Sequence, residues 1–202
     1  MSDVYGFDRG TPLDRYYIEN FLSENAKLLK GVVLEVLNDN YTKKYGGDNV
    51  SRSDVLDIDP KNKQANIRAD LRNTQNLPPN VYDCIILTQV LQFIDDVDAA
   101  IASAYRMLKP GGTLLCTLPS VSRIDCVAKE EGDYWRFTKA SATYLFAKHF
   151  KGENLVISAF GNVFVDVCFL EGIALEEITK KELDYVDSNF PLLICVKAIK
   201  EQ

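Results

Sequence analysis

The fold is decided by residues 81–118, VYDCIILTQVLQFIDDVDAAIASAYRMLKPGGTLLCTL. The apolar run at 81–87 predicts a buried strand. From Val97 to Leu108 apolar residues recur at helical spacing, behind two aspartates that can cap a helix. Lys-Pro-Gly-Gly at 109–112 predicts the end of that helix, and residues 113–118 predict another strand. This alternation indicates a parallel sheet with helices on its faces.

The flanking segments extend the same pattern. Thr11 and Pro12 predict a helix start, with Thr11 as the capping residue, and an apolar helical stripe then runs towards Lys30. Thr138 and Thr179 are expected to cap two later helices. We predict further strands at residues 32–37, 54–58, 65–69, 155–160 and 191–199. The fold class is therefore α/β, with a Rossmann-like, mostly parallel sheet, helices on both faces and an antiparallel C-terminal edge.

One segment fits this scheme badly. The link at residues 60–64 is very short for a parallel crossover, which usually needs about a dozen residues. Either a crossover helix is missing there, or one of the two weak strands beside it is misplaced.

The composition excludes several classes of function. The chain has 202 residues, one histidine and a net charge of −6. A single histidine cannot build a multi-histidine metal site, so we expect no metal. The acidic excess argues against a nucleic-acid partner. There is no apolar run of about 18 residues and no signal peptide, so we expect no membrane span and a cytoplasmic location.

The cysteines show no metal-binding spacing and have no histidine partners. Three of them lie inside apolar stretches, so buried, reduced thiols are expected rather than disulfides or zinc ligands. The five cysteines are Cys84, Cys116, Cys126, Cys168 and Cys195.

Polar residues recur where the predicted strands end. In an open parallel sheet, ligands bind outside the carboxyl ends of the strands. A carboxylate after the second strand can accept both hydroxyls of a ribose, and one after the third can accept an adenine amine. Acids at strand ends are usually only solvated, but their repetition along one edge favours a binding site. The residues are Glu35, Asp57, Asp59, Asp70, Thr88 and Gln89.

Several segments together resemble the class I S-adenosylmethionine-dependent methyltransferases. They are VVLEV, DVLDIDP, RADL, YDCIILTQVLQFIDD and RMLKPGGTLL. GFDRGTPLDRYYIENFL near the start, GDYWRFT at 132–138 and the tail with AFGN and ELDYVDSNFPLLICVKA resemble a subgroup often found with glycan biosynthesis. The resemblance covers nearly the whole chain, and this subgroup is similarly short after Asp59.

The resemblance implies a site for S-adenosylmethionine and assigns roles to its residues. Glu35 and the turn of Val36, Leu37 and Asn38 would face the methionine moiety. Either Asp57 or Asp59 would hold the ribose. The remaining implied contacts are Asp70 and Leu71 at the adenine, and Thr88 and Gln89 near the transferred methyl group. The implied organisation is one domain over 1–202, with a helical N-terminal lid (1–30), a cofactor-binding core (31–118) and an acceptor side (119–202).

The first strand departs from the family pattern. The motif normally reads Glu-x-Gly, and the glycine lets the backbone approach the cofactor closely. Here the sequence is Glu35-Val36-Leu37, so a leucine Cβ is expected to clash or to force the turn outward. Two interpretations remain open: a remodelled turn with weaker cofactor binding, or a lost pocket in a non-catalytic domain.

The acceptor side is expected to involve Asp133, Tyr134, Trp135 and Arg136. An aromatic cluster with an acid and a guanidinium can stack on a sugar and hydrogen-bond to it. Alternatively, Trp135 and Phe137 could simply anchor a loop to the core. If the acceptor is a hydroxyl, a general base would help, and Asp133, Asp14 and Tyr134 are the candidates. The catalytic set is thus Asp14, Asp133, Tyr134 and Arg136, whereas His149 is expected to be a helix-end bystander.

We therefore expect O-methylation of a sugar or glycan acceptor, in association with glycan-assembly enzymes. The first alternative is a cofactor-free scaffold or partner-binding domain, which the missing glycine favours. A second alternative is another Rossmann-type enzyme that modifies nucleotide sugars. It is disfavoured because no G-x-G-x-x-G follows the first strand.

Overall fold

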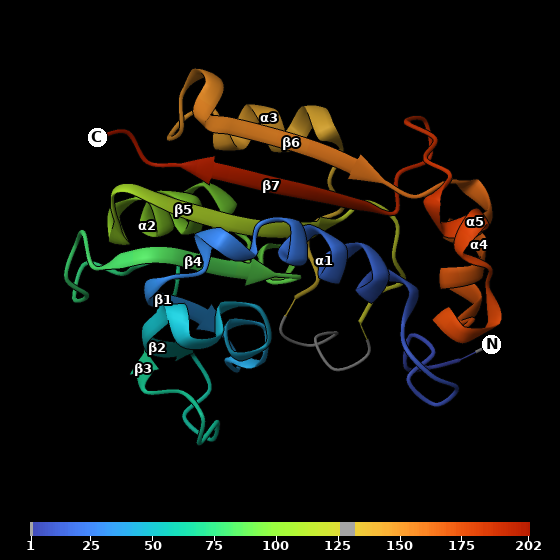
Figure 1. Ribbon diagram of the computed structural model, residues 1–202, viewed down its shortest axis with the longest axis horizontal. Helices are drawn as coiled ribbons and strands as arrows, with labels where there is room; N and C mark the ends of the chain where they lie inside the picture. The colour runs from blue at the N-terminus through green and yellow to red at the C-terminus, as the bar shows by residue number, and fades with distance from the viewer. Residues whose placement is uncertain (1, 126–131) are drawn as a thin grey trace.

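The computed structural model describes residues 2–125 and 132–202. It contains a seven-stranded sheet in the order β3-β2-β1-β4-β5-β7-β6 (Figure 1). Strands β1 to β5 run parallel, and β7 is antiparallel to both of its neighbours, β5 and β6. The strands are β1 (Gly31–Val36), β2 (Val50–Asp57), β3 (Ile67–Arg68), β4 (Tyr82–Thr88), β5 (Leu108–Pro119), β6 (Leu155–Phe160) and β7 (Leu193–Ile199). The predicted α/β class with an antiparallel C-terminal edge is confirmed.

Helices cover both faces of the sheet because the strands are apolar on both sides. Helices α2 and α3 pack on one face, and α1, α4 and α5 pack on the other (Figure 1). Along β5, Leu114 faces the first core and Leu115 the second, as strand alternation requires. The helices are α1 (Leu13–Glu24), α2 (Val97–Met107), α3 (Lys139–Phe146), α4 (Val163–Glu171) and α5 (Lys180–Asp184).

Three of the four predicted helix caps are confirmed. The side chains of Asp96, Thr138 and Thr179 each accept a backbone N–H at the start of α2, α3 and α5. The prediction for Thr11 is wrong: Pro12 stands at the cap position of α1 and no side chain caps it. The hydroxyl of Thr11 instead donates to Glu176 (2.8 Å), a contact that local sequence could not reveal.

The short link after β2 needs no crossover helix. Strand β3 pairs only with the last two residues of β2, Leu56 with Ile67 and Asp57 with Arg68. The chain therefore returns only to the end of β2, and the Asn66 side chain accepts the Val55 N–H (2.7 Å) on the way. Both weak strands were placed correctly.

Helix α1 is a layer of the core as well as a wall of the site. Leu13, Ile18 and Leu22 are fully buried against the sheet. Only its first turn reaches the cavity described below, through Pro12, Asp14 and Arg15. Within residues 2–125 and 132–202, no helix is both long and apolar enough to cross a membrane.

The cysteines follow the expectation where they are described. Cys84, Cys116 and Cys195 are buried and unpaired, and Cys168 is unpaired and partly buried. Burial raises the pKa of these thiols, most strongly for the three that are fully enclosed. Cys126 lies outside the described residues.

Candidate functional site

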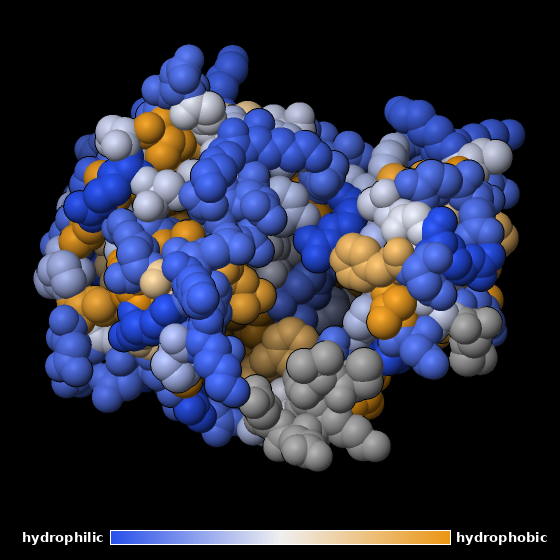
Figure 2. Space-filling model, turned by 90° about the horizontal axis from the view of Figure 1, so that it is seen from below, coloured by the Kyte–Doolittle hydropathy of each residue, from blue (hydrophilic) through white to orange (hydrophobic). Residues whose placement is uncertain are grey.

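The expected cofactor residues lie along one edge of the sheet. Strands β3, β2, β1 and β4 are neighbours and parallel, so their carboxyl ends meet at the same edge. Leu37 follows β1, Asp57 ends β2, Asp70 follows β3, and Gln89 follows β4. Seen from below, the molecular surface is hollowed between this half of the sheet and the part that contains α4 and α5 (Figure 2).

Glu35 shapes the turn after β1. It is 2% exposed, and its carboxylate accepts both the N–H (2.8 Å) and the hydroxyl (2.8 Å) of Thr42 as well as the N–H of Tyr41 (3.2 Å). Desolvation raises the pKa of Glu35, and these hydrogen bonds partly oppose it. The carboxylate therefore holds the start of the π-helical turn η2 (Thr42–Gly46).

Leu37 adopts the backbone conformation that favours glycine. Its φ is +72°, its N–H donates to the Leu56 carbonyl (3.1 Å), and its side chain is 53% exposed. The turn is thus attached to β2 through the backbone of Leu37. The Asn62 amide strengthens the link by donating to the Leu37 carbonyl (2.7 Å) and to Asp57 (2.7 Å).

The two aspartates after β2 differ in their surroundings. Asp57 is 6% exposed, and its carboxylate accepts from the Asp59 N–H (2.9 Å) and from Asn62. Asp59 lies in the exposed turn, where it accepts from the Lys61 N–H (2.8 Å). Only Asp57 is thus set into the sheet edge itself.

Asp70 is held by a neighbouring guanidinium. Arg72 donates to both of its carboxylate oxygens (2.6–3.1 Å) and also to Asp95 (2.9 Å). These bonds lower the pKa of Asp70. The side chain of Leu71 is buried in the core, so only its backbone can contact a ligand.

A cavity of about 220 Å³ lies beyond β4 and β5, among residues expected to form the acceptor side. Gln89 and Pro119 at the ends of these strands border it, together with the first turn of α1. Gln89 itself has φ +55° and donates its N–H to the Thr117 carbonyl (3.1 Å). The lining residues are Tyr5, Phe7, Pro12, Asp14, Arg15, Gln89, Gln92, Phe93, Pro119, Val121, Ser122, Asp125, Asp133, Arg136, Phe169, Leu192 and Leu193.

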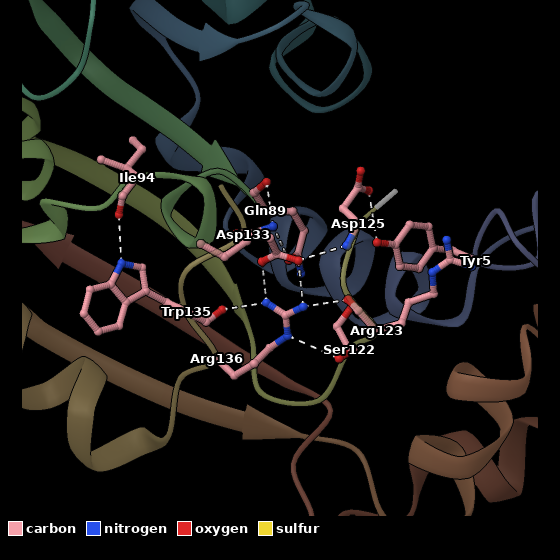
Figure 3. Close-up of polar contacts among 10 residues, drawn as sticks. Tyr5, Gln89, Ile94, Ser122, Arg123, Asp125, Asp133, Trp135 and Arg136 are labelled. Atoms are coloured by element: carbon pink, nitrogen blue, oxygen red, sulfur yellow. Dashed lines mark hydrogen bonds and ion pairs between the residues drawn. The ribbon is translucent and has the colours of Figure 1, made fainter. Parts of the chain in front are cut away.

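The Asp133–Arg136 pair organises the wall of this cavity (Figure 3). Two nitrogens of Arg136 meet the two carboxylate oxygens of Asp133 at 2.6 and 2.9 Å, and the guanidinium also donates to the carbonyls of Ser122, Arg123 and Trp135. Arg136 keeps the pKa of Asp133 below its usual value. A carboxylate held in this way is a poor proton acceptor, so the pair is better suited to holding the loop.

The aromatic residues of this segment have separate environments. Phe137 is buried in the core and anchors the segment, as one of the two interpretations expected. Trp135 is 43% exposed, and its indole N–H donates to the Ile94 carbonyl (2.9 Å; Figure 3). Tyr134 is 51% exposed and is not part of the cavity wall.

Asp14 borders the cavity from the first turn of α1. Its Oδ1 is buried and has no hydrogen-bond partner among the described residues. Burial raises the pKa of Asp14, and the adjacent Arg15 partly counteracts this. Of the expected acceptor-side acids, Asp14 is therefore the one with an uncommitted oxygen.

Sequence reasoning missed much of the cavity. Gln92 was detectable, because it is a polar residue inside the apolar stretch Val90–Ile94, three positions after Gln89. Tyr5, Val121 and Phe169 are brought in by distant segments, and no local pattern marks them. His149 lies away from the cavity and contacts Asp98 (3.2 Å), which agrees with a bystander role.

The residues on the sheet edge fit S-adenosylmethionine in their chemistry. The carboxylates of Asp57 and Asp70 only accept hydrogen bonds, which suits ribose hydroxyls and an adenine amine. The left-handed backbone at Leu37 preserves the conformation that glycine would provide. An edge with these acids also suits a cationic sulfonium.

A family model described as a methyltransferase domain matches residues 29–116. The ubiquinone/menaquinone biosynthesis C-methyltransferase UbiE of Haemophilus ducreyi is 42% identical over 52 residues, which make up 25% of this chain and 20% of that protein. The chain covers a fifth or less of the first curated relatives that it matches.

Solved structures share the fold over most of the chain. An S-adenosylmethionine-dependent methyltransferase from Archaeoglobus fulgidus has a TM-score of 0.59 at 13% identity, covering 92% of this chain and 94% of that one. The N-methyltransferase NodS from Bradyrhizobium japonicum, solved with S-adenosylhomocysteine, has a TM-score of 0.57 at 14% identity, covering 96% and 90%. The chain thus carries a match to a methyltransferase domain over residues 29–116 and shares the fold of solved S-adenosylmethionine-dependent methyltransferases over most of its length.

Proposed function

We propose that this protein transfers a methyl group from S-adenosylmethionine to a hydroxyl group of a sugar or glycan acceptor. One observation supports this most directly. The cavity adjoins the cofactor edge at Gln89 and is lined by Asp14, whose Oδ1 has no hydrogen-bond partner among the described residues. When bound, S-adenosylmethionine supplies an electrophilic methyl group on a sulfonium.

The chain's own residues divide the work between the two regions. Asp57 holds the ribose, Asp70 the adenine, and the turn of Val36, Leu37 and Asn38 the methionine moiety. Glu35 and Asn62 keep that turn in position. Gln89 lies between the cofactor edge and the acceptor cavity, where aligning the reacting groups and excluding water can accelerate the transfer.

The acceptor cavity suits a small ring. Its volume of about 220 Å³ is below the ~300–1,000 Å³ of pockets for drug-sized ligands. Aromatic side chains such as Phe93 and Phe169 can pack against the apolar C–H face of a sugar. Within the domain, we propose residues 31–118 as the cofactor-binding core and the remainder as the acceptor side, with residues 1–30 forming its N-terminal cover.

Calorimetric titration with S-adenosylhomocysteine tests the cofactor part of this proposal. We expect micromolar binding by the wild-type protein and at least tenfold weaker binding by Asp57→Ala, because the ribose loses its acceptor. The matched control is Asp59→Ala, at the exposed neighbouring aspartate, and it should change the affinity less than threefold. Absence of wild-type binding up to millimolar concentration would instead favour a cofactor-free scaffold in a glycan-assembly system.

A further inference from the structure

Two residues that line the acceptor cavity each have a buried acceptor oxygen without a hydrogen-bond partner among the described residues. The oxygens are Oδ1 of Asp14 and Oε1 of Gln92. They come from different parts of the chain, α1 and the 3₁₀ turn η4 (Leu91–Phe93). A buried acceptor without a donor is destabilising, so two of them in one wall indicate a ligand that brings donors.

The orientation of the Gln92 amide is set by its neighbours. Its nitrogen donates to the backbone carbonyl of Gln89 (3.0 Å) and to the Gln89 side-chain oxygen (3.3 Å). A backbone carbonyl can only accept, so this end of the amide must be the nitrogen. The backbone carbonyl of Gln92 accepts the backbone N–H of Tyr134 (2.8 Å), which ties the residue to the next loop. Oε1 is therefore presented as a fixed acceptor.

The charges around the cavity disfavour an anionic ligand. Three carboxylates and two guanidiniums line it. Arg136 is paired with Asp133, whereas Arg15 donates to the neutral Tyr41 hydroxyl and keeps its charge beside Asp14. The lining carries one more carboxylate than guanidiniums, so an acceptor with a phosphate or carboxylate near its reacting hydroxyl would meet a net negative charge.

We infer that the cavity binds an uncharged ring with two neighbouring hydroxyl groups, one donating to Asp14 and the other to Gln92, and that Asp14 takes the proton of the hydroxyl that is methylated. This inference rests on the proposed function and narrows its substrate class to neutral diols. The acceptor oxygen bonds to the methyl carbon as the carbon–sulfur bond breaks. The bonding pair stays on sulfur, S-adenosylhomocysteine leaves, and the hydroxyl proton passes to Asp14.

Three one-ring probes separate the candidate ligand classes. Methyl β-D-glucopyranoside, cyclohexylammonium and cyclohexanecarboxylate are titrated against the protein saturated with S-adenosylhomocysteine, and binding is followed by saturation-transfer NMR. We expect the glucoside to bind, and Gln92→Met and Asp14→Ala each to weaken it about tenfold. Gln75→Met, the same substitution at an exposed glutamine that does not line the cavity, should leave it within twofold. The inference is overturned if the glucoside does not bind, if either charged probe binds more tightly, or if neither variant weakens it.

The proton transfer has its own readout. The charged and titratable groups that share the cavity are Tyr5, Arg15, Asp125, Asp133 and Arg136. Hydroxyl donors stabilise the charged form of a carboxylate, so the pKa of Asp14, followed by carboxyl ¹³C NMR, should fall when the glucoside is added. The isosteric Asp14→Asn should lower the methyl-transfer rate by about 10²–10⁴-fold and keep the S-adenosylhomocysteine affinity within twofold.

The outcomes distinguish this inference from the function on which it rests. If S-adenosylhomocysteine does not bind the wild-type protein, the proposed function fails. If it binds but the glucoside leaves the Asp14 pKa unchanged, or Asp14→Asn retains the full rate, only the role of Asp14 is refuted.

Discussion

Replacing Leu37 by glycine tests how the protein tolerates the missing motif glycine. A left-handed backbone costs an L-residue about 1–2 kcal/mol, and Leu37 has φ +72°. Glycine removes this cost. It also raises the conformational entropy of the unfolded chain, which lowers the free energy of unfolding by about 0.5–1 kcal/mol. Leu37→Ala keeps the backbone cost and removes nearly the same side-chain atoms, so it is the matched control.

The two variants should therefore differ in stability. We expect Leu37→Gly to be about 0.5–1 kcal/mol more stable than Leu37→Ala in urea unfolding monitored by circular dichroism. Both variants lose the partly exposed leucine side chain, so its contribution to stability largely cancels when the two variants are compared with each other. Equal stabilities would refute a left-handed Leu37 in solution. We also expect Leu37→Gly to bind S-adenosylhomocysteine at least threefold more tightly than the wild type, and unchanged affinity would show that the leucine does not obstruct the cofactor.

Two further predictions concern buried charges. Burial raises the pKa of Asp166 on α4 from its ordinary value of 3.8 to about 6, so the wild type loses stability as the pH rises through this interval. After allowance for solvent screening, Asp166→Asn should be about 1–2 kcal/mol more stable than the wild type at pH 7.5 and equal to it near pH 4. A pH-independent difference for Asp166→Asn would contradict this. Arg136→Met leaves the buried Asp133 carboxylate without its cation and should lower the free energy of unfolding by about 3 kcal/mol. The double variant Asp133→Asn/Arg136→Met should recover part of this loss. A double variant as unstable as the single one would argue against a stabilising role of the ion pair.

Local patterns were sufficient for most of the secondary structure. Strand β6 was predicted at residues 155–160, where it is found, because an apolar run bounded by turn residues allows few alternatives. Helix α2 was equally clear, since its apolar spacing and its Asp96 cap agree. The error at Thr11 has a tertiary cause: Glu176, far away in sequence, takes the hydroxyl that would have capped the helix.

That these polar residues share one edge of the sheet was also predictable from the order of strands and acids. Parallel neighbours bring their carboxyl ends together whatever the loops do, so Asp57, Asp70 and Gln89 had to share an edge. The sequence left Asp57 and Asp59 as equal candidates. Only the structure separates them, because burial depends on where the strand ends and the turn begins.

The sequence by itself thus determined the sheet, its carboxyl-end acids and the unusual leucine after the first strand, since these depend on local periodicity and on strand order. Only the tertiary structure decided which backbone conformation that leucine adopts and which of the expected acceptor-side acids is already paired. Leu37 keeps the left-handed turn because Leu56 on β2 and Asn62 in the loop after β2 hold its backbone. Asp133 pairs with Arg136, whose guanidinium is also held by the carbonyls of Ser122 and Arg123, whereas Oδ1 of Asp14 has no partner among the described residues.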